Sequence, residues 1–172
     1  ENYKNIENLR NGITNFYEPN LNKIFKRNKK NIFFTNSIVD MKECDLVFFS
    51  KDVPTNSKNQ SLYNGINKLI IKTLKNLNKN SIFIILSQVQ HGFTENIKWP
   101  KKNLYYQVET LIFGDAVKRA LNPQQFIVGS SNNKINNKYS KFLKSYNWKI
   151  NNMNYQSAEL AKISINLYLI SS

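Results

Sequence analysis

The closing segment QSAELAKISINLYLISS, Gln156 to Ser172, places three polar side chains at helical spacing. Glu159, Lys162 and Asn166 stand at i, i+3 and i+7, so a helix would carry them on one face. Side chains of these types form surface ion pairs, and they also occur in catalytic sites. The spacing alone favours an ordinary solvated pair between Glu159 and Lys162, which contributes about 0.3 kcal/mol.

A second face of the same segment is apolar. Leu160, Ile163 and Leu167 also recur at i, i+3 and i+7, which predicts an amphipathic helix beginning near Ser157. We expect these three side chains to face the core and the polar stripe to lie away from it.

Short apolar runs rich in β-branched and aromatic residues alternate with segments of helical period. Strands are predicted at 31–35, 45–50, 81–86, 103–108, 125–130 and, more weakly, 148–153. Helices are predicted at 19–28, 61–78, 91–97, 114–121 and 136–146, before the last one. Such strands suit burial on both faces, which indicates an α/β fold with a mostly parallel sheet covered by helices on both sides. The sheet core is expected to include Phe33, Phe34, Phe48 and Phe49.

Length and composition narrow the class of protein. A chain of 172 residues suits one domain, or one domain and the start of another. The net charge of +14 would suit a nucleic-acid partner, but the lysines are scattered among asparagines, which argues against that class. With no membrane-length apolar run and no cleavable signal, we expect a cytoplasmic protein without a membrane partner. The single cysteine, Cys44, excludes an internal disulfide, offers no metal cluster and is expected to pack in the core.

Polar loops follow three of the predicted strands. They are KDVPTNSKNQ (51–60), SQVQHGFT (87–94) and ETLIFGDA (109–116). In parallel α/β sheets, ligands bind at the carboxyl ends of the strands, so these loops are where a site is expected. The sequence contains no G-x-G-x-x-G loop for a dinucleotide pyrophosphate.

Five motifs in order resemble one enzyme family. NLRNGITNFYEPNLNKIF with its YEP-x-L, DLVFFSKDVPT, SIFIILSQVQHGFT, ETLIFGDAVKRALNPQQFIVG and SAELAKISINLY are similar to the UDP-glucose/GDP-mannose dehydrogenase family, over nearly the whole chain. The resemblance implies an NAD-dependent oxidation of the C6 alcohol of a nucleotide sugar to a carboxylate. It also implies an incomplete Rossmann-type domain at 1–153 and the start of a long central helix at 157–172.

The same resemblance implies that the chain is a fragment. The family's first strand, glycine loop and second strand would precede Glu1, and its nucleophilic cysteine would follow Ser172. We therefore expect a part of a longer enzyme that is inactive by itself and that forms a homodimer through the central helix. The expected substrate is UDP-glucose, with related nucleotide sugars left open.

The family's catalytic residues map onto three positions. Lys162 and Asn166 match the lysine and asparagine that stabilise charge on the reacting C6 oxygen, and Glu109 matches a glutamate that serves acid-base steps of thioester hydrolysis. Substrate binding is expected from Leu111 together with Lys162 and Asn166.

The resemblance places NAD against two loops. The matching positions are Val53, Pro54, Thr55, Ser87 and Gln88. Pro54 equally fits a strand end and Ser87 equally fits a helix cap, so both alternatives stay open. No metal is expected, and the only histidine, His91, matches no base of the family.

Several positions depart from the family's pattern, in the loops that would meet cofactor and substrate. They are Gln88, Gln90, Phe93, Gln107, Val108, Phe113, Arg119 and Gln125. Two other classes therefore remain open, a non-catalytic α/β binding or assembly module and, less favoured, a basic nucleic-acid-binding domain.

Overall fold

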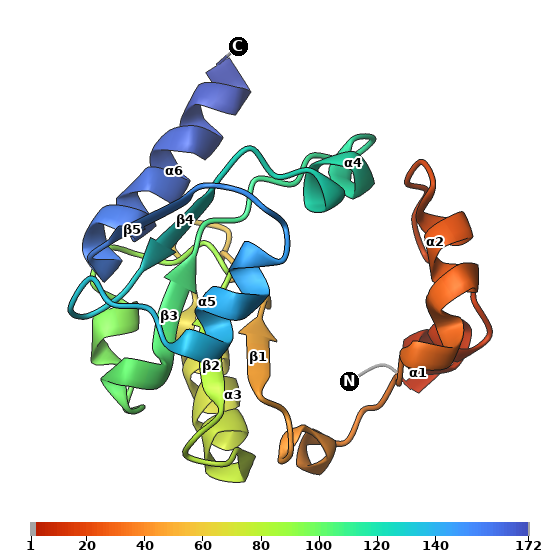
Figure 1. The fold of residues 1–172 in the computed structure, drawn as a ribbon, viewed down its shortest axis with the longest axis horizontal. Coiled ribbons are helices and arrows are strands. Elements are labelled where there is room, and N and C mark those ends of the chain that lie inside the picture. Colours follow the sequence, from red (N-terminus) through yellow and green to blue (C-terminus); the bar gives the residue numbers. More distant parts are fainter. Residues whose placement is uncertain (1–2, 172) are drawn as a thin grey trace.

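The computed structural model describes residues 3–171, and these residues form one sheet with helices around it (Figure 1). The strands are β1 (Leu46–Phe49), β2 (Ile82–Ile85), β3 (Leu104–Gln107), β4 (Phe126–Gly129) and β5 (Ile150–Met153). The α-helices are α1 (Tyr3–Arg10), α2 (Leu21–Asn28), α3 (Tyr63–Asn76), α4 (Ala116–Leu121), α5 (Asn137–Lys144) and α6 (Tyr155–Ser171). Single 3-10 turns are η1 (Lys29–Asn31), η2 (Ile38–Met41), η3 (Thr94–Asn96) and η4 (Lys101–Asn103).

The sheet has the order β1-β2-β3-β4-β5 and is mostly parallel. Only β4 runs antiparallel to its neighbour β3, while the other three pairs are parallel. Helices α3 and α6 pack on one face and α5 on the other. The predicted α/β fold with helices on both faces is therefore confirmed. Because the parallel strands end at one edge, the loops after β1 and β2 begin there together.

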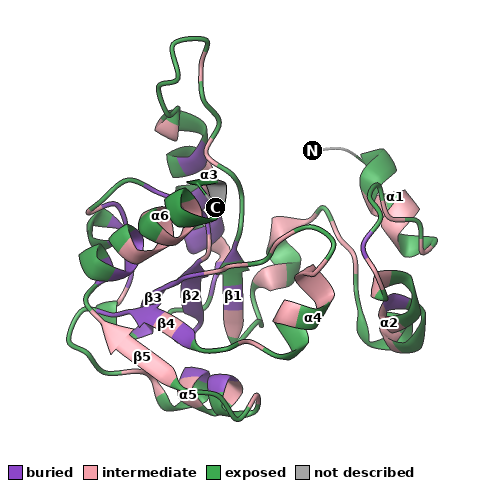
Figure 2. Cartoon of the chain, turned by 90° about the horizontal axis from the view of Figure 1, so that it is seen from above, coloured by how far each residue is buried: buried purple, intermediate pink, exposed green. Residues whose placement is uncertain are grey.

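The central strand β2 is enclosed on both sides. All four of its residues are fully buried, and Figure 2 shows its neighbour β3 buried as well, whereas its other neighbour β1 is buried only in part. Phe83 and Ile85 belong to the cluster under α3 and α6, whereas Ile82 and Ile84 belong to the cluster under α5. Alternate side chains point to opposite faces, so a strand buried on both faces needs an unbroken apolar run. This is why IFII was readable as a strand.

The helices form largely where the sequence predicts them. In α3, Ile66, Ile70 and Leu74 recur every four residues and are buried against the sheet. The segment 91–97 is an exception, because only η3 forms there. Gly92 has a left-handed φ of 80°, which begins a turn rather than a helix. Among the helices that the structure describes, none is both long and apolar enough to cross a membrane.

The strand predicted at 31–35 is wrong. Phe33 is 76% exposed, and Phe34 lies against Phe25 of α2 with ring centroids 5.6 Å apart. The Arg10 Nε–H donates to the Phe34 carbonyl oxygen at 2.9 Å, so this carbonyl is used outside any sheet. Among residues 3–171, no strand lies on the outer side of β1 where this run could pair.

Two other predictions about the core need correction. Cys44 is exposed, because it lies in the turn before β1 rather than inside the sheet. Phe48 is 37% exposed since its side of β1 is covered mainly by Phe142, whereas Phe49 is buried on the α3 side.

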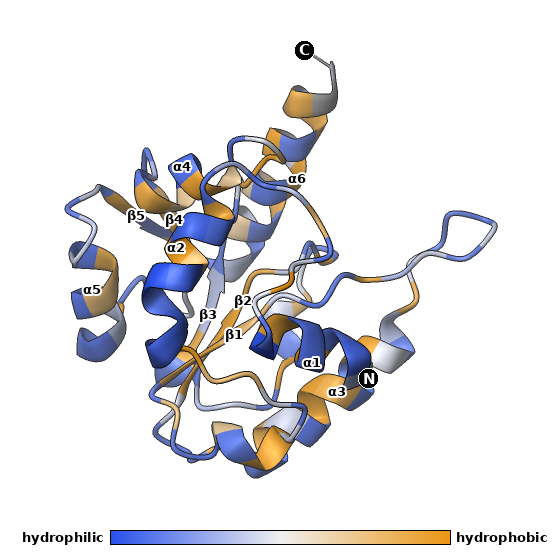
Figure 3. Cartoon of the chain, turned by 90° about the vertical axis from the view of Figure 1, so that its right-hand side faces the viewer, coloured by the Kyte–Doolittle hydropathy of each residue, from blue (hydrophilic) through white to orange (hydrophobic). Residues whose placement is uncertain are grey.

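Residues 3–31, here named the amino-terminal arm, extend away from the sheet (Figure 1). The arm contains α1, which the sequence analysis missed, together with α2 and η1. Figure 3 shows that α1 and α2 are mostly hydrophilic. Phe25 is the buried apolar residue of α2, and α1 buries none. The arm therefore depends on polar contacts to hold its position.

Candidate functional site

Helix α6 packs against the sheet through the face opposite to the one predicted. Ala158 and Glu159 are fully buried, whereas Leu160 is 48% and Leu167 63% exposed. Tyr155 at the start of the helix donates its hydroxyl to the Leu104 carbonyl oxygen at 2.8 Å. The polar stripe therefore faces the body of the protein, and much of the predicted core face lies outside.

A close approach between α6 and β4 explains this orientation. A Cβ added at Gly129 would lie 2.9 Å from the Ala158 Cβ and 3.0 Å from the Tyr155 Cα. Small residues thus allow the helix to lie directly on the strand. Only the side of α6 that carries Ala158 can make this contact, and Glu159 and Lys162 border that side.

Glu159 is not the solvated partner of Lys162 that spacing favoured. Its carboxylate accepts the Gly92 N–H at 2.6 Å and the Thr94 N–H at 2.8 Å. A buried carboxylate requires such donors, because burial of an unpaired charge is costly. Glu159 therefore attaches α6 to the loop that follows β2.

Lys162 reaches the loop that follows β3. Its ammonium donates to the carbonyl oxygen of Glu109 and is half-buried. Burial lowers the pKa of Lys162, against the opposing attraction of the Glu109 and Asp52 carboxylates. Asp52 belongs to the loop after β1, so carboxylates from two strand ends act on this ammonium.

Asn166 lies one helical turn after Lys162 and contacts the loop that follows β2. Its Nδ2 donates to Gln88 Oε1 at 2.5 Å, and Gln88 belongs to the loop after β2. The structure therefore places Lys162 and Asn166 of α6 against the loops that carry Glu109 and Gln88. The group lies at the carboxyl ends of β2 and β3, beside the polar stripe of α6.

Glu109 contributes through two different atoms. Its carbonyl oxygen meets Lys162, while its carboxylate Oε1 accepts the Thr110 N–H at 2.9 Å. A cavity of about 620 Å³ adjoins it and is lined partly by Gln107, Phe126 and Ile165. Leu111 lies two residues beyond Glu109 and is 45% exposed, so the structure does not bury it in the site.

Three of the residues predicted to meet the cofactor, Val53, Pro54 and Thr55, lie in the loop after β1. Pro54 and Thr55 lie in an exposed loop that folds back on itself, since Thr55 bridges to Ser61 and the Pro54 carbonyl accepts the Leu62 N–H at 2.7 Å. Val53 is partly buried beside the core cluster.

Ser87 is 4% exposed and bonded to backbone. Its hydroxyl reaches the carbonyl oxygens of Lys51 at 2.7 Å and Phe49 at 3.3 Å. Ser87 therefore ties the ends of β1 and β2 together, a role that neither alternative from the sequence had named.

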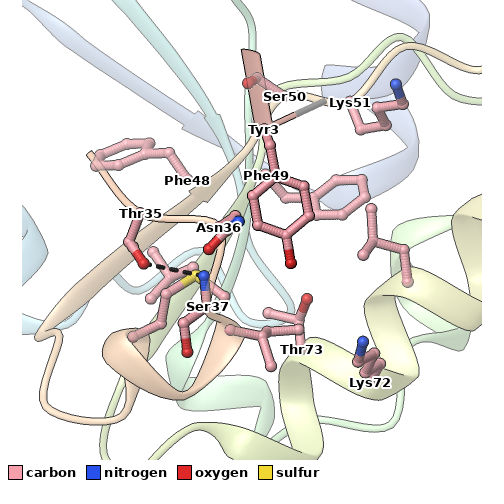
Figure 4. Close-up of a pocket in the computed structure, with 14 residues that line it drawn as sticks. Tyr3, Thr35, Asn36, Ser37, Phe48, Phe49, Ser50, Lys51, Lys72 and Thr73 are labelled. Atoms are coloured by element: carbon pink, nitrogen blue, oxygen red, sulfur yellow. Dashed lines mark hydrogen bonds between the residues drawn. The ribbon is translucent and has the colours of Figure 1, made fainter. Parts of the chain in front are cut away.

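A second cavity lies along the outer side of β1 (Figure 4). Its volume is about 740 Å³, and Phe49, Ser50 and Lys51 line it where the strand ends. Lys72 and Thr73 of α3 close another side. This cavity touches the beginning of the loop that carries Asp52 and Val53.

Two of the positions that depart from the family pattern, Gln107 and Phe93, have structural roles. Gln107 Oε1 accepts the hydroxyl of Tyr139 at 2.5 Å, and burial raises the pKa of Tyr139. Phe93 is buried against Tyr63, with ring centroids 5.3 Å apart. Phe113, in contrast, is 85% exposed. The first two substitutions are thus absorbed by packing.

Sequence reasoning missed three carboxylates that the structure makes important. Glu159 was read as a surface residue, and neither Asp52 nor Glu18 was singled out. The YEP motif indicates that a turn begins at Glu18, but the residues near Glu18 in the sequence do not identify the groups that its carboxylate binds. Those partners, the amides of Gly114 and Ala116, lie almost a hundred residues away.

Comparison with known proteins identifies the family and the fold. Residues 1–147 match the sequence model of the UDP-glucose/GDP-mannose dehydrogenase family, NAD binding domain. The chain is 29% identical over 175 residues to UDP-glucose 6-dehydrogenase of Gallus gallus, covering 89% of this chain and 35% of that enzyme. Its fold matches GDP-mannose dehydrogenase from Pseudomonas aeruginosa (TM-score 0.84, 14% identity, 99% of this chain, 43% of that one). It also matches UDP-D-ManNAc dehydrogenase from Pyrococcus horikoshii (TM-score 0.85, 18% identity, 97% and 43%).

The chain spans 35% of the length of the curated relative and 43% of each solved structure. At such low identity the solved structures show the shared Rossmann-like fold, and the family match, which covers most of the chain, shows its ancestry. The resemblance found in the motifs and the prediction of NAD as cofactor are confirmed. The chain belongs to the UDP-glucose/GDP-mannose dehydrogenase family and matches its NAD-binding domain.

Proposed function

We propose that this chain is part of an NAD-dependent dehydrogenase that oxidises the C6 alcohol of UDP-glucose to the carboxylate. One observation carries the proposal. Lys162 and Asn166, one turn apart on α6, meet the loops after β3 and β2 at Glu109 and Gln88. An ammonium and a carboxamide thus lie one helical turn apart at the strand ends, where an α/β sheet binds its ligands.

Each of the two oxidation steps from alcohol to carboxylate removes a hydride from carbon and a proton from oxygen. The proton would pass to solvent water, and negative charge develops on that oxygen. When bound, NAD supplies the hydride acceptor. The Lys162 ammonium would stabilise the negative charge, and its half-buried position makes that interaction stronger than it is in water. The Asn166 Nδ2 would donate a second hydrogen bond to the same oxygen.

Glu109 would serve the hydrolytic stage, in which a water molecule attacks a thioester. Its carboxylate is oriented by the Thr110 N–H and lies within the electrostatic reach of Lys162. We place the thiol of that thioester outside this chain. Cys44 precedes β1 and therefore lies toward the end of the sheet opposite the site.

The residues present fit one portion of NAD. The cavity of about 740 Å³ beside β1 is within the range of small-molecule sites and reaches the loop that carries Val53. Pro54 and Thr55 would contact the nicotinamide ribose from the exposed part of this loop. Gln88 would approach the cofactor from the loop after β2, with Ser87 holding both loops in place.

We also propose the arrangement of the longer protein. Residues 1–153 would form the cofactor domain, and 157–172 would begin a central helix that pairs with its copy in a homodimer. The exposure of Leu160, Leu167 and Tyr168 on α6 supports this pairing, because such a stripe is usually covered in an oligomer. A cytoplasmic location and a role in polysaccharide precursor synthesis are consistent with this activity.

Calorimetric titration of NADH and UDP-glucose into the full-length protein that contains this chain tests the proposal. Both should bind, and Lys162→Met should reduce turnover by about a thousandfold. Lys141→Met, on the exposed part of α5, provides the charge-matched control and should leave turnover unchanged. GDP-mannose and UDP-N-acetylmannosamine in parallel titrations identify the preferred nucleotide sugar.

The same experiment separates the other classes of function. Failure of both NADH and UDP-glucose to bind would leave the non-catalytic binding or assembly module as the function. Salt-sensitive binding of a random oligonucleotide would instead indicate the nucleic-acid class. The isolated chain is expected to produce no NADH from NAD and UDP-glucose, and turnover by this chain alone would contradict the fragment hypothesis.

A further inference from the structure

A buried carboxylate joins the amino-terminal arm to the loop after β3. Glu18 is 5% exposed, and its Oε2 accepts the Gly114 N–H at 2.8 Å. Its Oε1 accepts the N–H groups of Ala116 at 2.8 Å and Val117 at 3.4 Å. Within residues 3–171 no basic side chain forms an ion pair with Glu18. Backbone amides therefore provide the compensation that its burial requires.

These amides come from one turn and from the start of α4. The first amides of a helix lack partners within it, and they favour a negative charge. Gly114 has a φ of 87°, a left-handed conformation that turns the chain just before α4. Phe113 lies edge-on to Phe16 of the arm, with ring centroids 6.3 Å apart. Polar and aromatic contacts thus hold the same junction.

Between β3 and α4 the loop has two main attachments. Near its start, Glu109 is bound to Lys162 through its carbonyl oxygen, and its far end is bound to Glu18. Between them, Leu111 is 45% and Phe113 85% exposed, so apolar burial contributes little. Loss of either attachment would leave the loop fixed at one end only.

We propose that Glu18 is a positioning residue that holds the 109–117 loop in the geometry needed to bind the nucleotide sugar. This inference rests on the proposed function, because it takes Glu109 and Leu111 as substrate contacts. Glu18 itself lies outside the reacting group and acts through the backbone of the loop. The amino-terminal arm thereby becomes part of the substrate site, although its helices are distant from β2.

Removal of the Glu18 carboxylate should affect UDP-glucose binding and NADH binding unequally. The loop after β2 carries Gln88 and is held separately by Glu159. Glu18→Ala should therefore weaken UDP-glucose binding about tenfold or more while leaving NADH affinity within about twofold. A residue that served only general stability would weaken both ligands together.

Two measurements on the full-length protein test this. Amide hydrogen exchange should rise about tenfold or more at Gly114, Ala116 and Val117 in Glu18→Ala, and stay unchanged in the 91–96 loop. Glu18→Gln keeps one acceptor oxygen and should recover part of both exchange protection and UDP-glucose affinity. Glu43→Ala removes an exposed glutamate and is the matched control.

The outcomes are distinguishable. Unchanged exchange at 114–117 would overturn the anchoring role, and faster exchange with unchanged UDP-glucose affinity would overturn the positioning role. Equal losses for NADH and UDP-glucose would also contradict it. If the unmodified protein binds no UDP-glucose, the proposed function fails, and the exchange comparison still decides whether Glu18 holds the loop.

Discussion

The loops after β2 and β3 border the same site but are held in different ways. Each is attached by a buried glutamate that accepts backbone N–H groups, Glu159 for the first and Glu18 for the second. Around Glu159 the loop also buries Phe93 and Ile97 in the main core. Around Glu18 the loop leaves Phe113 exposed.

This difference indicates how the two sides of the site respond to change. The loop after β2 is part of the core, so it can move only if the packing of α6 also changes. The loop after β3 depends on polar contacts to an arm that is itself thinly packed, so it can open locally. Under the proposed function, the loop that would meet the cofactor is therefore rigid and the loop that would meet the substrate is adaptable.

The largest effect is expected from Glu159→Ala. The Gly92 and Thr94 N–H groups would then be buried without acceptors, which should lower the free energy of unfolding by about 3 kcal/mol. For a domain of this size the midpoint of thermal unfolding should fall by about 6 to 12 °C. Urea denaturation followed by circular dichroism measures the loss. Glu159→Gln retains one acceptor and should lose less, and a loss below about 1 kcal/mol in the alanine variant would contradict the core-bound loop.

Gly129→Ala should have the next largest effect. The new Cβ would lie 2.9 Å from the Ala158 Cβ and 3.2 Å from the Tyr106 Cβ, so α6 must shift away from β4. Such overpacking should cost about 2 kcal/mol. Gly65→Ala, at a position with open space around it, provides the control and should not destabilise. Equal stability of the two variants would show that α6 does not depend on this contact.

Much of the sheet was predictable because its signals are local. The run IFII is buried on both faces and needs no distant information to be recognised as a strand. The run at 31–35 has similar composition and still forms no strand, because strand formation requires a neighbour with which to pair. Composition therefore identifies segments able to form strands, and topology decides which of them do so.

The site was only partly predictable for a related reason. The spacing of Lys162 and Asn166 placed both on one face of α6, and the motif resemblance named Glu109, but spacing assigned the wrong face to the core. A helix usually buries its apolar side, yet here the small residues Gly129 and Ala158 set the contact. A buried carboxylate leaves no local pattern in the sequence. Glu18, for example, is bound by backbone amides that lie far along the chain.

Glu18→Ala should destabilise the protein less than Glu159→Ala. Its amide partners are at a loop and at the start of the short helix α4, which can open to water without exposing the sheet. We expect a loss of about 1 kcal/mol in the free energy of unfolding, measured by urea denaturation beside the Glu159 variant. If the two losses are equal, the substrate-side loop is coupled to the core as firmly as the cofactor-side loop, and the comparison fails.

Lys162→Met should have the smallest effect on stability, and its sign depends on pH. Burial lowers the pKa of Lys162 from 10.5, so folding disfavours the charged form, and methionine keeps the packing without that cost. At neutral pH the lost hydrogen bond to the Glu109 carbonyl oxygen offsets this gain, so the stability of the variant should be close to that of the wild type. Between the lowered pKa and 10.5 the unfolded state binds more protons, so the wild type gains stability relative to the variant as pH rises. Urea midpoints from pH 7 to 10.5, with Lys141→Met as control, test this. If the wild type instead loses stability relative to the variant as pH rises, the Glu109 and Asp52 carboxylates outweigh burial, and the ammonium bound to the loop after β3 is an ordinary ion pair.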